Sequence, residues 1–323
     1  MTKRSDRTRK IGLLSIVIVS LIIGGYLYFP HTTWSQMRNQ QSAQRGIGWM
    51  LKHNKEMTPR DAVAYLMGIY KVIGDENIAK EIYQVIEIER AKIEQVETLV
   101  DPKIEKLDWG RDVAPVAEEI ARLQCQGKIV EQEIKTLKEI LAEHKQEMFP
   151  TDFPDVDKHI AEYDLREIGI ETSELFDTPV LNPRKLVVEE NGQLSTTDRQ
   201  WLYGLTHSVI VPTGYFDSYL DPQVYPEQIE LLNAVLETKG MTIKQDSTLD
   251  IVAQVIVSLK LLRQGDNEVV RTMQSKLVAV QNADGSWGDS EVVSSLKIHE
   301  TAGSIMALLN FAPQFKPEKV FCY

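Results

Sequence analysis

The sequence predicts an all-α domain, built from helical hairpins and preceded by one transmembrane helix. Three observations support this fold class. An uncharged apolar run occupies residues 11–29, most later segments space their apolar residues by three and four, and no alternating pattern is bounded by hairpin turns. Spacing by three and four is typical of amphipathic helices, whereas half-buried strands alternate with a period of two.

The composition is that of a folded protein that does not bind nucleic acid. The chain has 323 residues, and 43% of them are hydrophobic, which is enough apolar material for a substantial core. Its formal net charge of -11 argues against nucleic acid as a partner, because phosphate contacts need a surplus of lysine and arginine. The two cysteines, Cys125 and Cys322, lack the spacing of a zinc knuckle or redox pair.

Residues 11–29 are expected to form the membrane anchor. At about 1.5 Å per residue, this run nearly matches a hydrocarbon core of roughly 30 Å. Residues 1–10 carry a strong excess of lysine and arginine, so the positive-inside rule keeps them in the cytoplasm. A cleaved signal peptide would have a shorter apolar run and a small-x-small site before Pro30. We therefore expect a single-pass cell-membrane protein whose large domain is exported, either periplasmic or extracellular.

The rest of the chain divides into three expected parts. Residues 30–44 are polar and are interpreted as a linker. Residues 45–150 are expected to form helical hairpins that include a long charged pair, one helix from about Glu76 and one after Trp109. This pair is either an antiparallel hairpin or two ordinary outer helices, and its seam of about three heptads favours the second interpretation. Residues 151–323 are expected to form a further helical region that starts with a proline-rich connector.

The most specific segment is a turn between two predicted helices. It reads Gln281-Asn282-Ala283-Asp284-Gly285-Ser286-Trp287-Gly288. Glycine allows tight turns, a glutamine can bond the next turn, and an indole can stack on it. The predicted structural residues are Gln281, Asp284, Gly285, Trp287 and Gly288. The segment resembles the repeat motif of the α/α toroid superfamily, in which terpene cyclases and the β-subunits of protein prenyltransferases stack helical hairpins into a barrel.

A wider resemblance to a bacterial branch of that superfamily covers about residues 155–312. It is carried by residues 203–207, by Leu249-Asp250 and by His299-Glu300-Thr301. The resemblance implies a toroid-like array of helical hairpins around an apolar central cavity. We call the segment at residues 281–288 the tryptophan turn. In the toroid enzymes, turns of this kind clamp outer helices together and lie away from the catalytic groups. Catalytic groups therefore have to be sought elsewhere.

His207, Asp250 and His299 are the candidate metal ligands. Each lies on a different predicted helix, and two imidazoles with one carboxylate would leave a fourth position open, as in catalytic zinc sites. Protein prenyltransferases hold zinc with an aspartate, a cysteine and a histidine, but no cysteine lies near these residues in the sequence. The alternatives are a polar pocket without metal, core histidines bonded to backbone carbonyls, and a helix-capping role for Asp250.

Tyr215, Asp217 and Asp246 are candidate ligand-binding residues. Asp246 and Asp250 are one helical turn apart and could share a face, but they do not form the tight aspartate cluster of protonating cyclases. No aspartate-rich motif for diphosphate ionisation occurs either. Relatives in the toroid superfamily place an acidic residue directly after the threonine that corresponds to Thr213, and this chain has Gly214 at that position. Asp217 would have to replace that acid from a displaced position, which catalysis seldom tolerates.

Two functions stay open. The first is an anchored, exported domain that binds a small ligand or a protein partner and has no clear catalytic motif. The second is a metal-dependent toroid enzyme that acts on a small or hydrophobic substrate through His207, Asp250 and His299, with zinc as the candidate metal. No nucleophile with a partnered base and no phosphate loop occurs, so binding is favoured. Polar groups that converge in an open cavity would favour a ligand over a protein partner.

Overall fold

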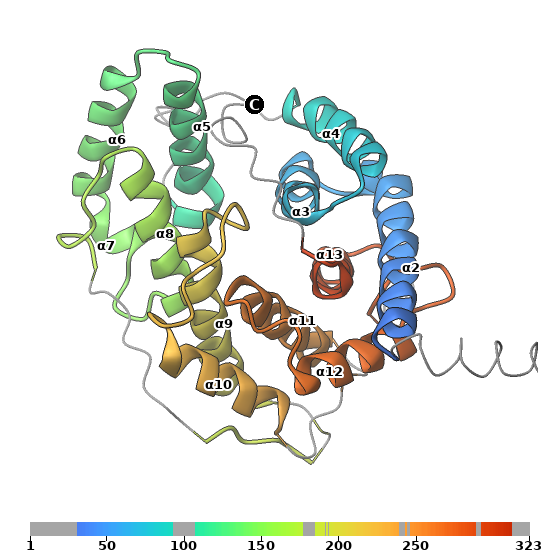
Figure 1. The fold of residues 1–323 in the computed structure, drawn as a ribbon. Helices are drawn as coiled ribbons and strands as arrows, with labels where there is room; N and C mark the ends of the chain where they lie inside the picture. Colours follow the sequence, from blue (N-terminus) through green and yellow to red (C-terminus); the bar gives the residue numbers. More distant parts are fainter. Residues whose placement is uncertain are drawn as a thin grey trace, which may run out of the picture.

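The computed structural model of the protein describes residues 31–92, 107–176, 185–190, 192, 194–238, 243, 246–288 and 292–311. Within these residues it contains twelve α-helices and no β-strand, which confirms the all-α prediction (Figure 1). None of these helices is both long and apolar enough to cross a membrane. The expected anchor at residues 11–29 and the tail before it lie outside the described residues.

The helices follow one another along the whole described chain. In order they are α2 (His31–Lys52), α3 (Pro59–Val72), α4 (Glu76–Arg90), α5 (Ala114–Cys125), α6 (Glu131–Glu143), α7 (Lys145–Met148), α8 (Asp155–Glu167), α9 (Thr196–Ile210), α10 (Pro226–Leu236), α11 (Asp246–Leu261), α12 (Glu268–Ala279) and α13 (Ser295–Leu308). Three shorter helical turns accompany them, namely η1 (Asn54–Glu56), η3 (Trp109–Val113) and η4 (Val211–Thr213).

The start of α3 follows from its local sequence. Thr58 is extended and accepts a hydrogen bond from the backbone N–H of Asp61 at 3.1 Å. Pro59 occupies the first helical position, where its missing N–H costs nothing. A threonine directly before a proline is a typical sequence signal for the start of a helix.

The predicted long helix after Trp109 is two helices, which corrects the sequence interpretation. Gly127 has a φ of 73° and separates α5 from α6. Lys128 N–H bonds to the carbonyl of Leu123 at 3.0 Å, and Gly127 N–H bonds to Gln124. This is a glycine-terminated C-cap, which ends a helix whatever the apolar spacing beyond it. Cys125 closes α5 and is disulfide-bonded, while Cys322 lies outside the described residues.

Two hydrophobic cores hold the helices together. The main core takes side chains from α2, α3, α4 and α9 to α13, and Trp287 is its largest fully buried member. The second core joins η3 with α5 to α8 around Trp109 and Phe149. In Figure 1 the helices of the second core form one side of the molecule, with α8 next to α9.

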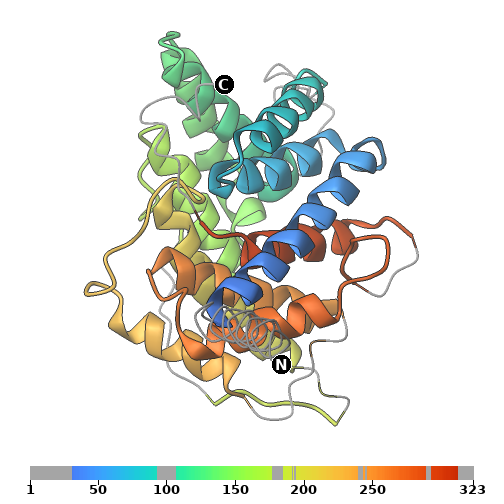
Figure 2. The same cartoon turned by 45° about the vertical axis from the view of Figure 1, so that its right-hand side comes forward.

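Residues 31–44, interpreted from the sequence as a linker, form more than half of α2. Ala43 is buried in the main core, and buried Asn39 donates to Gln274 of α12 at 3.3 Å. Figure 2 shows α2 crossing α13 and α12, and the contacts between these helices agree. Polar residues occur here because only one face of α2 is covered. Part of the segment interpreted as a linker therefore belongs to the folded domain.

From α9 to α13 the helices alternate between an inner and an outer position (Figure 1). Along the inside, α8 packs on α9, α9 on α11, α11 on α13, and α13 on α3. The helices α10, α12, α2 and α4 lie at the periphery of these (Figure 1). The first described helix, α2, lies beside the last described helix, α13.

Candidate functional site

Asp250 is the centre of a polar site between four inner helices. It lies on α11 and is fully buried. Its Oδ2 accepts from the Tyr203 hydroxyl of α9 at 2.6 Å. One turn further along α11, Gln254 Nε2 donates to Oδ1 at 3.2 Å and to Oδ2 at 3.1 Å. Thr206 in turn donates to Gln254 Oε1 at 3.0 Å, so the orientation of the amide is fixed. These neutral donors allow the carboxylate to stay buried.

His299 is the accessible member of the site. It lies on α13, and its side chain is 36% exposed. Its Nε2 lies 3.4 Å from Asp250 Oδ1 and 3.3 Å from Gln254 Nε2. A protonated Nε2 can donate to the carboxylate, and an unprotonated Nε2 can accept from the amide. Both forms of the imidazole therefore have a partner. Tyr65 of α3 stacks on the ring, with 5.3 Å between the centroids.

His207 of α9 is held neutral. Its Nδ1 lies 2.9 Å from the backbone carbonyl of Tyr203, and a carbonyl can only accept, so Nδ1 carries the proton. Burial lowers the pKa of His207 to about 4 against the opposing effect of that carbonyl, and the nearby charge of His299 lowers it further. At neutral pH the Nε2 of His207 is thus a lone-pair acceptor.

Two tyrosines complete the site as hydrogen-bond donors. Burial raises the pKa of Tyr65 to about 12, with smaller contributions from Asp61 and Asp250. Burial and the carboxylate of Asp250 also raise the pKa of Tyr203. Both hydroxyls therefore keep their protons at any physiological pH. The Asp250 site consists of Tyr65, Tyr203, His207, Asp250, Gln254 and His299.

Of the three predicted metal ligands, Asp250 and His299 lie 3.4 Å apart, and His207 is near enough for their charges to affect its pKa. Among the described residues, no group of three or more His, Cys, Asp or Glu side chains is arranged to hold a metal ion. Asp250 already accepts from Tyr203 and Gln254, and His207 directs Nδ1 at a carbonyl. Zinc would have to bind through His207 Nε2, His299 and an Asp250 oxygen freed from its donors. Zinc binding stays a prediction.

The candidate ligand residues Tyr215 and Asp217 lie at a second position, after η4. Gly214, Tyr215 and Phe216 have φ values of 69°, 48° and 80°, a left-handed run that is strained at the two aromatic residues. Buried Lys71 of α3 fastens this turn, because its Nζ donates to Gly214 O at 2.8 Å and to Asp217 Oδ2 at 3.0 Å. Asp217 is therefore paired and does not belong to the Asp250 site.

The last ligand candidate, Asp246, is the first residue of α11, one turn before Asp250. Its side chain is outside the described part of the structure, so its predicted role stays untested.

The tryptophan turn joins α12 to α13 and contacts α2. Gln281 Nε2 donates to Ser42 O and to Gly285 O, both at 2.8 Å. Trp287 is fully buried, and its indole N–H donates to the carbonyl of Leu277 at 2.9 Å. The turn thus ties two neighbouring helices to the first helix of the fold.

The other three residues of the predicted turn set, Asp284, Gly285 and Gly288, fix its backbone. Asp284 Oδ1 accepts from the backbone N–H of Ser286 at 2.9 Å and from its hydroxyl at 2.6 Å. Gly285 and Gly288 have φ values of 96° and 97°, which residues other than glycine rarely adopt.

Sequence reasoning missed Tyr65, Tyr203 and Gln254 as site residues. For Gln254 a signal existed, because its spacing of four from Asp250 puts both side chains on one face of a helix. For Tyr65 none existed, because a tyrosine among apolar residues of an amphipathic helix looks like any core aromatic.

Comparisons with known proteins do not assign the chain to a family. No protein-family model matches the sequence, and no curated protein or solved structure is significantly similar to it. The resemblance to the α/α toroid superfamily therefore stays a prediction.

Proposed function

We propose that this chain is a membrane-anchored, exported helical domain that binds a small polar ligand at the Asp250 site. One observation carries the proposal. Four helices from distant parts of the chain surround a fully buried carboxylate with partly exposed tyrosine and histidine side chains. Polar groups that converge at an accessible point are typical of ligand sites, whereas a scaffold would fill the same space with aliphatic side chains.

The chemistry of the site favours a ligand that has both donors and acceptors. The neutral His207 offers a lone pair at Nε2, and the hydroxyl of Tyr65 offers a proton. The imidazole of His299 has one nitrogen that can donate and one that can accept, and its Nε2 lies near Asp250 and Gln254. A hydroxylated or amino-bearing small molecule fits these groups. The stacked ring of Tyr65 adds an apolar surface for its carbon skeleton.

We further propose that the helices form an α/α toroid with the Asp250 site on its inner side. The alternation of inner and outer helices from α9 to α13 supports this arrangement, as does the position of α2 beside α13. All side chains of the Asp250 site come from inner helices, namely α3, α9, α11 and α13. The uncharged run at residues 11–29 and the basic tail before it support anchoring and export.

Ligand binding can be tested with the full chain in detergent micelles. Thermal unfolding would be followed by tryptophan fluorescence in the presence of a library of amino acids, amines, polyols and sugars. A ligand that binds only the folded state raises the unfolding temperature. We expect such compounds to lose their effect in His299→Ala and to keep it in His144→Ala, which removes a histidine from α7's N-terminus. Stabilisation that survives both His299→Ala and Tyr65→Phe would place the binding elsewhere.

The metal-dependent enzyme is the second candidate, because Asp250 and His299 lie 3.4 Å apart and His207 is near them. Elemental analysis of the full chain, purified without a metal-binding tag, tests it against a His207→Ala/His299→Ala double variant. Near-stoichiometric zinc that is lost in the double variant would support a metal site and justify screening for hydrolytic reactions. Equal metal content in both proteins would leave ligand binding without metal.

A further inference from the structure

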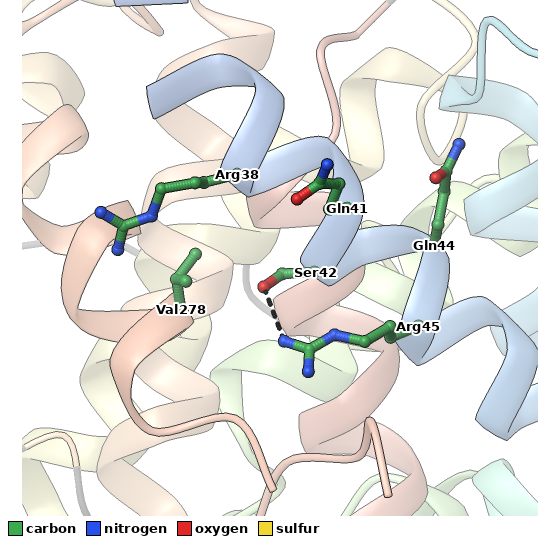
Figure 3. A pocket seen from close by; sticks show the side chains of 6 residues that line it. All are labelled: Arg38, Gln41, Ser42, Gln44, Arg45 and Val278. Atoms are coloured by element: carbon green, nitrogen blue, oxygen red, sulfur yellow. Dashed lines mark hydrogen bonds between the residues drawn. The ribbon is translucent and has the colours of Figure 1, made fainter. Parts of the chain in front are cut away.

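A groove runs between α2 and α12, away from the Asp250 site. It has a volume of about 680 Å³ and is lined by six residues, Arg38, Gln41, Ser42, Gln44, Arg45 and Val278 (Figure 3). None of these six is acidic, although the chain as a whole carries a net charge of -11. The two guanidinium groups and the amide of Gln41 lie on the side of α2 that faces Val278, whereas the amide of Gln44 points away from the two arginines (Figure 3).

The two arginines carry positive charge that no described carboxylate neutralises. Arg38 is exposed and makes no hydrogen bond or ion pair with a described residue. Arg45 donates to the hydroxyl of Ser42 at 3.4 Å and to the side-chain oxygen of Gln281, and both acceptors are neutral. Arg45 is therefore held in place without losing its charge. Seven residues separate the arginines, which is about 10 Å along a helix axis and puts them on one face.

The tryptophan turn positions Arg45 and the neighbouring backbone of Ser42. Gln281 accepts from Arg45 while its amide nitrogen holds Ser42 O and Gly285 O. A side chain that accepts from one groove residue and donates to another fixes the edge of the groove. This gives the turn a second consequence besides clamping α2.

We propose that the groove binds a phosphate group, presented by an anionic lipid headgroup or by a soluble phosphorylated molecule. Guanidinium groups bind phosphate oxygens through paired, charge-assisted hydrogen bonds, and the amide of Gln41 can add a neutral donor. The same face of α2 continues toward its N-terminus with Trp34 and Met37, which are 59% and 53% exposed. An exposed tryptophan and methionine beside arginines suit the interface of a membrane, where acyl chains meet headgroups.

Binding can be measured with the full chain in a phosphate-free maltoside detergent. Isothermal titration would compare inorganic phosphate, dihexanoyl phosphatidylglycerol and zwitterionic dihexanoyl phosphatidylcholine. We expect the anionic lipid to bind, and its affinity to fall at least about tenfold in Arg38→Gln/Arg45→Gln, because two charge-assisted contacts are lost. The matched control, Arg90→Gln/Arg166→Gln, removes the same charge from α4 and α8 and should bind like the wild type.

The two sources of phosphate are separated by the ligands. Binding of phosphatidylglycerol but not of phosphate identifies a lipid headgroup, and binding of both identifies a site open to soluble phosphorylated molecules. Binding of neither, or equal binding by wild type and the Arg38→Gln/Arg45→Gln variant, overturns the proposal. The single variant Arg38→Gln breaks no contact with a described residue, so weaker binding in this variant cannot come from a loosened α2.

Discussion

Folding lowers the pKa of His207, so the free energy of unfolding of the domain should depend on pH. Its folded pKa is about 4, below the ordinary value of 6.5. Between these two values the unfolded chain binds a proton that the folded chain does not bind, so the free energy of unfolding falls as the pH decreases. Because part of the side chain remains exposed, we expect a loss of about 1 to 3 kcal/mol from this group between pH 6.5 and 4.

Urea unfolding of the wild type and of His207→Gln at several pH values measures this loss. The difference between the two curves should change over that window, whereas His144→Gln should run parallel to the wild type. A constant difference between wild type and His207→Gln would show that the imidazole titrates normally in the fold.

Asp164 of α8 is expected to destabilise the protein when it ionises. The residue is buried, and its Oδ2 has no hydrogen-bond partner among the described residues. Burial raises the pKa of Asp164 well above its usual range, and Glu118 and Glu167 raise it further. A raised pKa means that stability present at low pH is lost as the pH rises through the folded value.

Asp164→Asn should therefore raise the free energy of unfolding by about 1 to 3 kcal/mol at pH 8, because the amide cannot ionise. The gain should shrink toward pH 4, where the wild-type carboxyl is protonated in the fold. Exposed Asp152 gives the control variant Asp152→Asn, which should have no such pH dependence. Destabilisation by Asp164→Asn at every pH would argue that the carboxylate has an essential partner.

Three of the site residues were predictable because they are chemically conspicuous. His207, Asp250 and His299 are ionisable groups in apolar helices, and such groups need a reason to be there. Their meeting point was not predictable, because it depends on how four helices pack. Tyr65 enters the site from α3, far away in the chain, and only the tertiary structure reveals that it stacks on His299.

At the scale of elements, the tryptophan turn is the strongest case of a sequence pattern with a structural cause. Gly285 has a φ of 96°, and a Cβ on it would lie 2.7 Å from the backbone oxygen of Arg45. Gly127 also has a positive φ, of 73°, but a Cβ there would meet nothing within 4 Å. The two glycines therefore separate the cost of backbone strain from the cost of close approach.

We expect Gly285→Ala to lower the free energy of unfolding by about 2 to 4 kcal/mol, and Gly127→Ala by about 1 to 2 kcal/mol. The larger loss arises because α2 has to move away from the turn. Chemical denaturation of both variants measures the difference. Equal losses would mean that the contact between α2 and the turn is easily relaxed.

Helix boundaries were predictable where the sequence contains a capping residue, as at Thr58. They were not predictable where two sequence signals competed. Around Gly127 the apolar spacing of Leu123 and Val130 continues in register, which predicts one helix. The glycine C-cap ends the helix nevertheless, because satisfied carbonyls and a left-handed glycine outweigh a spacing that two packed helices can also provide.

At the scale of the whole molecule, the all-α class was predictable from periodicity alone, but the role of residues 31–44 was not. A helix that is covered on one side only reads as polar in sequence. Its buried Asn39 and Ser42 are polar residues that bond to α12 and to the tryptophan turn, so they give no apolar signal.

A chain that begins at residue 45 should consequently be much less stable than one that begins at His31. It would lack the Asn39–Gln274 hydrogen bond and leave part of the main core open beside α13. Thermal unfolding and the soluble yield of the two proteins measure this. Equal unfolding temperatures would show that the first half of α2 only rests on the surface.

Because α2 pairs with α12, it cannot complete its packing until most of the chain has been synthesised. Asn39 and its partner Gln274 are 235 residues apart. At a synthesis rate of roughly 5 to 20 residues per second, α2 waits about 10 to 50 s before α12 exists. During that interval the unpaired face of the nascent helix is open to other chains and to proteases. A chaperone that binds the growing chain would therefore have to cover α2 until α12 has been synthesised.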